Sequence, residues 1–234
     1  MNKILLISIL SIFFASCTSS IEGEGAATSK KSYTIDEITN VDISCNCNVT
    51  ILTGSEVGVK VESRQNIIDN LNVKAKNGKL VIDESKQVAD FSAYDIFIYV
   101  TRQLNKVELK KQTVFNVSGT LTVDDLDLSA VDQVKVDNIN IFTNNLKLTV
   151  KDQAFVSLKG SAIALIYKGS NQSQGYLFDF ETNDAQINTN DNAILEINSK
   201  KSLLGSVKGN SIVTYMGDPR KDTKVSDNAQ VVKK

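Results

Sequence analysis

The chain has 234 residues, 41% of them hydrophobic and 23% charged, so it is too apolar for a disordered chain and long enough for one large all-β domain or two small ones. It contains no histidine, which is the commonest general base, metal ligand and partner of a nucleophile, so we expect a non-enzymatic protein without a metal or other cofactor. The 26 basic and 27 acidic residues alternate and give a net charge of -1, without the basic stripe that nucleic acids require, so we expect no nucleic-acid partner.

The N-terminal segment, residues 1–17, has the features of a bacterial lipoprotein signal. Lys3 supplies a positive charge, and the run from Ile4 to Phe14 is apolar or serine throughout but too short to span a bilayer. The sequence Phe14-Ala15-Ser16-Cys17 then resembles a lipobox, with phenylalanine in place of the usual leucine. We predict that residues 1–16 are a cleaved signal peptide and that acyl chains such as palmitate anchor Cys17 in a membrane. The alternative is an ordinary secretory signal with a chance cysteine.

Residues 17–31 predict the lipidated cysteine and a flexible tether. The segment from Thr18 to Lys31 is rich in Ser, Thr, Gly, Glu and Ala, and a flexible chain of this length has a root-mean-square reach of roughly 20 Å. We expect an outer-membrane lipoprotein of the cell envelope. The isolated Glu22 and Glu24 are weak support for surface export, so the periplasmic and the surface face both stay open.

Residues 32–234 predict a single β domain, whose first part, residues 32–114, reads as an antiparallel meander. Strict alternation marks the longest strand, with apolar residues at Val41, Ile43, Cys45, Cys47, Val49 and Ile51. Asn77-Gly78 predicts a two-residue hairpin turn, since both central residues of a type I′ turn need positive φ. The segment from Asn66 to Leu71 predicts a helical turn.

Residues 115–234 predict the coils of a right-handed parallel β-helix. Short alternating strands are separated by polar corners that recur with a period of about 18–20 residues. The corners are Asp132, Asp152, Asn171, Asp191, Gly209 and Asp227. A coil of this length cannot bury its own apolar face and must stack on its neighbours. An immunoglobulin-like sandwich is the alternative, but its turns recur at intervals of roughly 8–12 residues. We expect the corner aspartates to form Asx turns by bonding their own backbone two residues on, without calcium.

These features together resemble the head GIN domain family of auto-transporter adhesins, common among lipoproteins of Bacteroidetes. The resemblance rests on the strand from Val41 to Ile51, the hairpin at Asn77-Gly78, the stepped short strands and the ending Tyr215-Met216-Gly217-Asp218-Pro219. It covers nearly all of the mature chain, although Asp-Gln and Asp-Asn corners replace the Gly-Ser-Gly corners usual in the family. It implies a β-helical ectodomain with an antiparallel N-terminal section and a role in adhesion.

Two groups of residues are candidates for a chemical role. Cys45 and Cys47 are two positions apart on one strand, about 6.6 Å between Cα atoms, so we expect two small buried residues; a disulfide at a bulge is the alternative. Asp124, Asp125 and Asp127 offer the paired carboxylates that glycoside hydrolysis requires. Asp125 and Asp127 alternate with leucines, however, which predicts a solvated outer face.

Aromatic residues gather at two places, at Tyr94, Phe97 and Tyr99 and again at Tyr167, Tyr176, Phe178 and Phe180. The even positions of the segment Tyr176 to Phe180 predict one aromatic face. We expect an interior stack, because equivalent side chains pile up along a solenoid. An exposed platform that binds a ligand is the alternative.

The sequence therefore predicts a non-enzymatic cell-envelope lipoprotein with a β-helical ectodomain, an adhesin or a module that binds a glycan or an envelope protein. A polysaccharide-active β-helix enzyme and a purely structural envelope protein are the alternatives. The only site residue assigned is Cys17, for lipidation.

Overall fold

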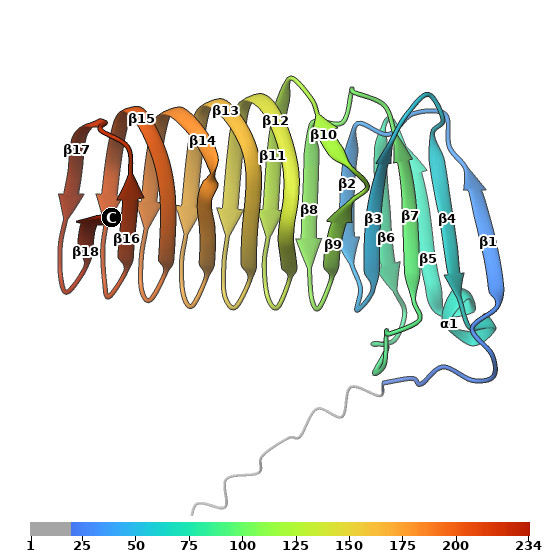
Figure 1. Ribbon diagram of the computed structural model, residues 1–234. Coiled ribbons are helices and arrows are strands. Elements are labelled where there is room, and N and C mark those ends of the chain that lie inside the picture. Colours follow the sequence, from blue (N-terminus) through green and yellow to red (C-terminus); the bar gives the residue numbers. More distant parts are fainter. Residues whose placement is uncertain (1–19) are drawn as a thin grey trace, which may run out of the picture.

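The computed structural model describes residues 20–234, which form one large β structure with a single short helix (Figure 1). The helix is α1 (Gln65–Asn70). The first nine strands are β1 (Ser29–Thr34), β2 (Asn40–Ser44), β3 (Asn48–Thr53), β4 (Gly58–Ser63), β5 (Leu71–Lys76), β6 (Lys79–Glu84), β7 (Asp95–Val100), β8 (Lys106–Lys110) and β9 (Val114–Val117). The others are β10 (Thr120–Thr122), β11 (Asp125–Ala130), β12 (Lys135–Val150), β13 (Phe155–Gly169), β14 (Gln174–Thr189), β15 (Ile194–Val207), β16 (Ile212–Met216), β17 (Arg220–Val225) and β18 (Gln230–Lys233).

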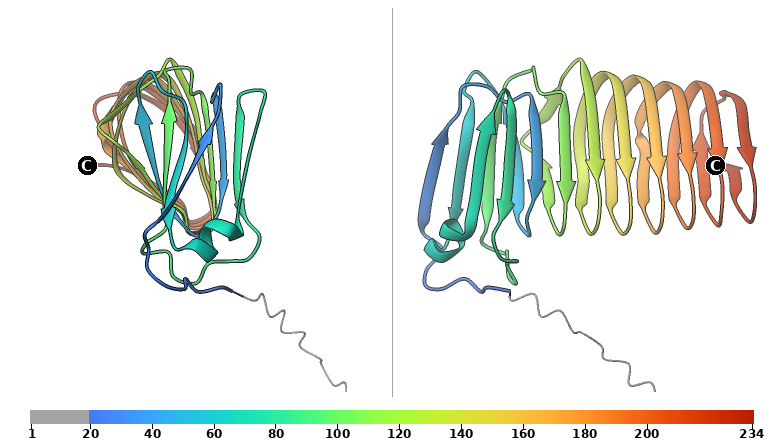
Figure 2. Two further views of the ribbon diagram at one scale, coloured as in Figure 1. Left: turned by 90° about the vertical axis from the view of Figure 1, so that its right-hand side faces the viewer. Right: turned by 180° about the vertical axis from the view of Figure 1, so that it is seen from behind.

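From β8 onward the chain winds as a solenoid, which confirms the predicted β-helix. Each of the long strands β12, β13, β14 and β15 bends once and makes a whole coil, and successive coils pair in parallel. Strands β16 and β17 continue the two faces of the last long coil, also in parallel. Seen end-on, the coils superpose around one enclosed interior (Figure 2, left).

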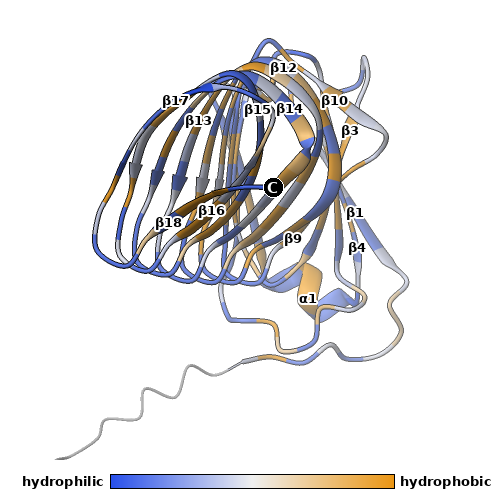
Figure 3. Ribbon diagram, turned by 60° about the vertical axis from the view of Figure 1, so that its left-hand side comes forward, coloured by the Kyte–Doolittle hydropathy of each residue, from blue (hydrophilic) through white to orange (hydrophobic). Residues whose placement is uncertain are grey.

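The interior is built by residues at equivalent positions of successive coils. Leu128, Leu148, Tyr167 and Ile187 are paired neighbours in one such row and are at most 1% exposed. Between them along each strand lie polar residues that face solvent, so hydrophobic and hydrophilic residues alternate along the strands (Figure 3). The alternation of period two thus decides which residues enter the core.

Tyr167 is the largest side chain of this row, and two glycines make room for it. A Cβ atom added to Gly175 would lie 2.6 Å from the Tyr167 hydroxyl oxygen, and one added to Gly169 would lie 2.8 Å from Cε1 of the ring. Burial raises the pKa of Tyr167 well above its usual value. Gly175 stands where the two neighbouring coils carry Val156 and Leu195, so small and large residues complement each other along the axis.

The predicted corners all lie on one edge of the solenoid, in the left-handed backbone region. Their φ values fall between 60° and 70°, and Lys111, which the sequence pattern does not reveal, occupies the equivalent corner of an earlier coil with φ 60°. Asp and Asn tolerate this region better than other residues with a Cβ atom, and glycine enters it freely. The residues after the corners are amides that bond to each other from coil to coil, as Asn210 and Asn228 do at 3.1 Å.

The prediction that the corner aspartates form Asx turns is wrong. Their carboxylates reach across to the previous coil: Asp132 accepts from the N–H of Lys111 at 2.9 Å, and Asp227 accepts from the N–H of Gly209 at 3.0 Å. The bond from Gly209 also holds the pKa of Asp227 below its usual value. The N–H two residues after the corner is not left for the carboxylate, because it already donates within the turn, as that of Ala154 does to the carbonyl of Lys151 at 3.1 Å.

The expected antiparallel meander over residues 32–114 is wrong for most of its strands. Strand β2 pairs in parallel with β6 and β8, and β3 pairs in parallel with β7 and β9, so these strands already form coils of the solenoid. Only the pairs β1–β4, β4–β7 and β5–β6 are antiparallel. The hairpin at Asn77-Gly78, with φ values of 50° and 72°, and the helical turn α1 are confirmed. Alternation marks a strand but does not choose its partner.

The expected flexible tether over residues 17–31 is shorter than predicted. Strand β1 begins at Ser29, and Ile21 pairs with Val88 in an isolated parallel bridge. Asn66 of α1 donates to the carbonyl of Glu22 at 2.8 Å and accepts from the N–H of Glu24 at 3.0 Å. Residues 20–28 therefore form an ordered strap under the N-terminal coils.

Replacing Asp152 tests whether the corners need a residue that tolerates positive φ. Because its φ is 60°, we expect Asp152→Ala to lower the free energy of unfolding by about 1 kcal/mol, since aspartate tolerates the left-handed region better than alanine does. Asp152→Gly should cost much less, since Gly209 occupies an equivalent corner. Urea unfolding of both variants measures this. An equal loss of stability in the two variants would mean that the lost contact of the carboxylate with Asn171, and not the backbone conformation, causes the destabilisation.

Gly175→Ala tests the complementary packing around Tyr167. The added methyl group would meet the tyrosine hydroxyl, so we expect a loss of about 1 to 3 kcal/mol in the free energy of unfolding, as for other overpacked cores. In a Tyr167→Phe background the clashing oxygen is absent, and the same substitution should cost clearly less. A double-mutant cycle measured by thermal or urea unfolding gives the coupling. Additive losses would contradict this arrangement.

Candidate functional site

The candidate site lies on the outer surface of the sheet formed by β9, the first parts of β12 to β15, β16 and β18. Outward residues of neighbouring coils lie side by side there and form rows across the strands. In one row Phe155 pairs with Gln174, which pairs with Ile194 of the next coil. In the adjacent row Ser157 pairs with Tyr176, which pairs with Glu196. We define the outer aromatic patch as Phe155, Tyr176 and Phe178.

A bulge in β14 borders this patch. The register of β14 shifts between Leu177 and Glu181 on the β15 side, and the β13 ladder shifts opposite the same segment. Leu177 and Phe180 both point inward, at 0% and 1% exposed, while the residues between them are displaced outward. The predicted single aromatic face of Tyr176, Phe178 and Phe180 is therefore wrong, because a bulge breaks the alternation on which it depended.

The three rings of the patch are half-buried, and Tyr176 and Phe178 line one depression. The ring centroids of Phe155 and Tyr176 are 5.3 Å apart and tilted by 40°. The ammonium group of Lys234 lies 4.2 Å from the ring centroid of Phe178, and Asn198 donates to the carbonyl oxygen of Phe178 at 3.1 Å, which holds the bulge in place. The interior stack expected for Tyr176 and Phe178 is thus wrong, whereas Tyr167 and Phe180 are core residues.

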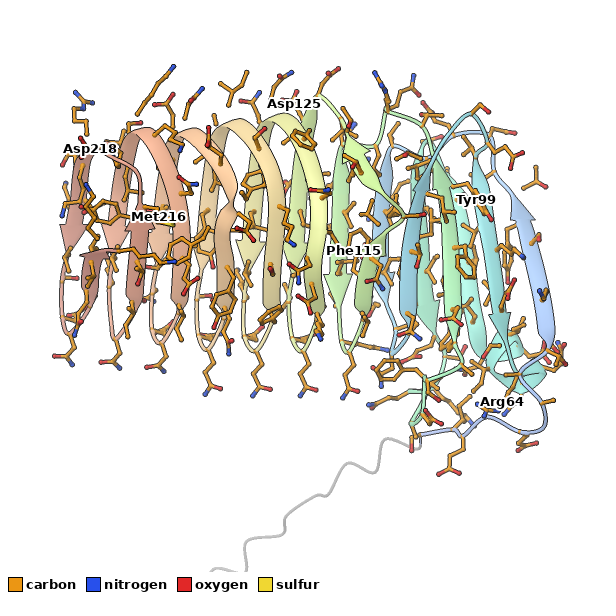
Figure 4. All side chains as sticks on the ribbon, in the orientation of Figure 1. Arg64, Tyr99, Phe115, Asp125, Met216 and Asp218 are labelled. Carbon is orange, nitrogen blue, oxygen red and sulfur yellow. A yellow bond between two sulfur atoms is a disulfide. The ribbon has the colours of Figure 1, made fainter. Side chains whose placement is uncertain are left out.

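Polar groups border the rings around a shallow depression of about 250 Å³. It is lined by Ser157, Leu158, Tyr176, Phe178, Asp179, Glu196 and Lys234. The side chain of Gln174 accepts from the Tyr176 hydroxyl at 3.3 Å. Beyond the depression the same face carries exposed aliphatic residues, Ile194, Ile212 and Val232, which are 36%, 43% and 48% exposed. This is the side of the sheet that carries Met216 in Figure 4.

Cys45 and Cys47 form a disulfide, so the expectation of two unlinked buried cysteines is wrong. They lie at the corner between β2 and β3, where the chain turns, and their Cα atoms are 5.5 Å apart, closer than in an extended strand. Both are fully buried. Disulfides persist in oxidising compartments such as the periplasm or the cell exterior.

An ion pair with a buried carboxylate supports the same corner. The Glu84 carboxylate, whose side chain is 0% exposed, contacts the Lys111 ammonium group at 3.2 Å and accepts from the N–H of Asn46 at 3.3 Å. Burial raises the pKa of Glu84, although Lys111 opposes the shift. The arrangement links three coils, since these residues come from β6, from the β2–β3 corner and from the corner after β8.

The carboxylates singled out from the sequence do not gather into a catalytic pair. Asp125 accepts from the Asn145 amide at 2.6 Å, and Asp127 pairs with the Lys147 ammonium group at 2.6 Å. Both lie on the outer face, as predicted. Within residues 20–234 no three acidic or cysteine side chains are grouped as metal ligands.

The first aromatic group divides between core and surface. Tyr94 is 1% exposed, and its burial raises the pKa of the phenol, whereas Phe97 and Tyr99 face outward from β7 and are half-buried. Cys17 and residues 1–16, the predicted lipidation site and signal peptide, lie outside the described residues. Between Ser20 and Lys234 no helix is long and apolar enough to cross a membrane.

Fold and surface together define the class: a β-solenoid protein with an aromatic patch on one outer face. The chain belongs to the family described as "Putative auto-transporter adhesin, head GIN domain", whose sequence model matches residues 37–219. This confirms the resemblance noted in the sequence. Membership of an adhesin family indicates a protein of the cell envelope or the cell surface.

Solved structures of low sequence identity share the fold. A "putative adhesin" from Bacteroides fragilis superposes with a TM-score of 0.84 at 18% identity, covering 92% of this chain and 100% of that one. A "Putative lipid binding protein" from Parabacteroides distasonis gives 0.73 at 14% identity, covering 92% and 100%. A "putative adhesin" from Parabacteroides merdae gives 0.68 at 15% identity, covering 92% and 99%. No curated protein matches the sequence at a significant level.

Proposed function

We propose that this protein is a non-enzymatic lipoprotein of the outer membrane, anchored through an acylated Cys17, that binds a glycan on its outer aromatic patch. The observation that carries the binding role is that Tyr176 and Phe178 face outward from β14 beside Phe155, next to a bulge that turns Asp179 outward as well. Bulges often re-aim side chains at functional positions. Its membership of an adhesin family supports a binding role.

Two features support export and anchoring. Residues 1–17 carry the charge, the apolar run and the Ala-Ser-Cys ending of a lipoprotein signal. The disulfide between Cys45 and Cys47 favours an oxidising compartment, which lies outside the cytoplasm of most bacteria. The anchor would keep the solenoid on the membrane from which it binds its ligand.

The chemistry of the patch favours a carbohydrate. Partly exposed aromatic rings present rigid surfaces on which the C–H groups of a sugar can stack. The carboxylates of Asp179 and Glu196 border the same depression and accept hydrogen bonds from hydroxyl groups. A surface that combines apolar rings with a few hydrogen-bonding groups can fix both the position and the orientation of a ligand.

Glycan binding by the non-acylated chain, residues 18–234, tests this proposal on an array of neutral and acidic glycans. We expect at least one glycan to bind, and Tyr176→Ser with Phe178→Ser to weaken that binding by about tenfold or more, equivalent to a loss of about 1.4 kcal/mol. Phe142→Ser is the matched control, because Phe142 is another exposed aromatic residue, 45% exposed, outside the patch.

Three outcomes would contradict the proposal. Equal binding by the patch variant and the wild type would place the ligand elsewhere. Binding of no glycan would favour the structural role. Release of reducing ends or unsaturated products from the bound glycan would establish the polysaccharide-active enzyme instead.

A further inference from the structure

The ordered strap of residues 20–28 ties the start of the described chain to one end of the solenoid. Ile21 donates to the carbonyl of Gln87 at 2.9 Å and accepts from the N–H of Ala89 at 3.0 Å. Arg64, at the start of α1, donates from Nε to the carbonyl of Gly25 at 3.1 Å. The strap therefore has contacts with both α1 and the loop after β6 and is not free to extend.

Ser20, where the strap begins, follows Cys17 closely in the sequence, with only Thr18 and Ser19 between them. A fully extended chain spans at most about 3.6 Å per residue, so the two Cα atoms are at most about 11 Å apart. This is about half of the roughly 20 Å reach expected for a flexible tether that extends to Lys31. An acyl chain on Cys17 would hold the strap almost at the level of the lipid headgroups.

The strap, α1 and the loop of residues 85–93 lie together at the lower end of the N-terminal coils and form what we call the base (Figures 1 and 2). We propose that the base rests against the headgroups of the bilayer, an inference that depends on the proposed acylation of Cys17. The outer aromatic patch then lies on a side face of the solenoid, on the sheet that contains β16 and β18, where a ligand close to the same membrane can reach it (Figure 1).

The charges of the base favour a zwitterionic bilayer as its partner. Its ionisable side chains are Glu22, Glu24, Arg64, Asp69, Lys86 and Asp90. Four carboxylates against two cations give no attraction to anionic lipids, so the short link to the acyl chains, and not charge, holds the base in place. Phe91, a half-buried aromatic residue of the loop, adds an apolar side chain of the kind found at membrane interfaces.

The rest of the lower edge is farther from the anchor. The solenoid corners Asp132, Asp152, Asp191 and Asp227 carry their carboxylates along it, exposed or nearly so. The base is also net negative, so charge does not distinguish the two regions. The short link from Cys17 leads to the base, and the contact is therefore confined to the N-terminal end of the solenoid.

Fluorescence quenching by headgroup-labelled lipids tests the orientation. The full-length protein, acylated at Cys17, is placed in phosphatidylcholine vesicles that contain a lipid with a nitroxide headgroup, and one fluorophore is attached to the variant Ala89→Cys or Lys76→Cys. Ala89 lies in the base and Lys76 beside the hairpin at the other end of β6, about 20 Å away along the strand. Both side chains are exposed, and the buried disulfide of Cys45 and Cys47 does not react.

We expect the fluorophore of the Ala89→Cys variant to lose most of its emission and that of Lys76→Cys to keep it. Inserting about twelve Gly and Ser residues between Ser19 and Ser20 should restore the emission at the base, because the longer link no longer holds it at the headgroups. An unquenched base in protein that floats with the vesicles, or quenching that the insertion leaves unchanged, would overturn the inference.

Flotation distinguishes this failure from failure of the anchor. Cys17→Ala protein should remain in the soluble fraction, whereas the wild type should float with the vesicles. If Cys17→Ala floats as the wild type does, the proposed acylation is wrong, and the orientation that depends on it is wrong with it.

Discussion

Backbone hydrogen bonds between successive coils are the interaction on which the rest of this structure depends. A single coil of about 19 residues has one apolar row on each face and too little area to bury it. Parallel pairing with the next coil satisfies the backbone groups of β12 to β15 and places identical positions in register, so each inward row becomes continuous. The core, the amide ladder at the corners and the outer patch are all consequences of this register.

The register also explains why part of the molecule could be predicted from sequence. A corner residue must adopt positive φ at every turn, so Asp, Asn or Gly recurs at intervals of one coil, as at Asp152 and Asn171. Lys111 occupies an equivalent corner without belonging to these residue types, and the pattern does not reveal it for that reason. Asn77-Gly78 predicts its turn correctly because both central residues of a type I′ turn need positive φ, and this requirement is visible in two adjacent residues.

The errors concern contacts between segments far apart in the sequence. The alternation of Val41 to Ile51 correctly marks inward residues, but the partners of β2 and β3 are strands β6 to β9, and nothing local in the pattern selects them. The same alternation predicts a continuous strand through Cys45 and Cys47, whereas a corner interrupts it and brings their Cα atoms to 5.5 Å. The bulge after Leu177 likewise interrupts the alternation, so Phe180 is buried although the pattern places it on the face of Tyr176 and Phe178. That this face is the outer one is decided by the contacts of the neighbouring coils, which the pattern does not contain.

The functional surface arises where this regular scaffold is interrupted. Several outward positions pair a polar residue with a polar residue of the next coil, as Asp127 and Lys147 do. On β14 the outward rings of Tyr176 and Phe178 lie beside Glu196 and beside Asp179, which the bulge turns outward, on a rigid sheet that needs no rearrangement to present them. Rigid presentation lowers the entropy lost when a ligand binds.

Amide hydrogen exchange at the corners tests the central role of pairing between coils most directly. The backbone N–H groups of Gln133, Gln153, Asn192, Asn210 and Asn228 each donate to a carbonyl of the previous coil, although they lie in turns at the surface. We predict that these amides exchange as slowly as those within β13 and β14, because both open only when coils separate. Exchange at the rate of exposed turns, with protection limited to the strands, would contradict the account.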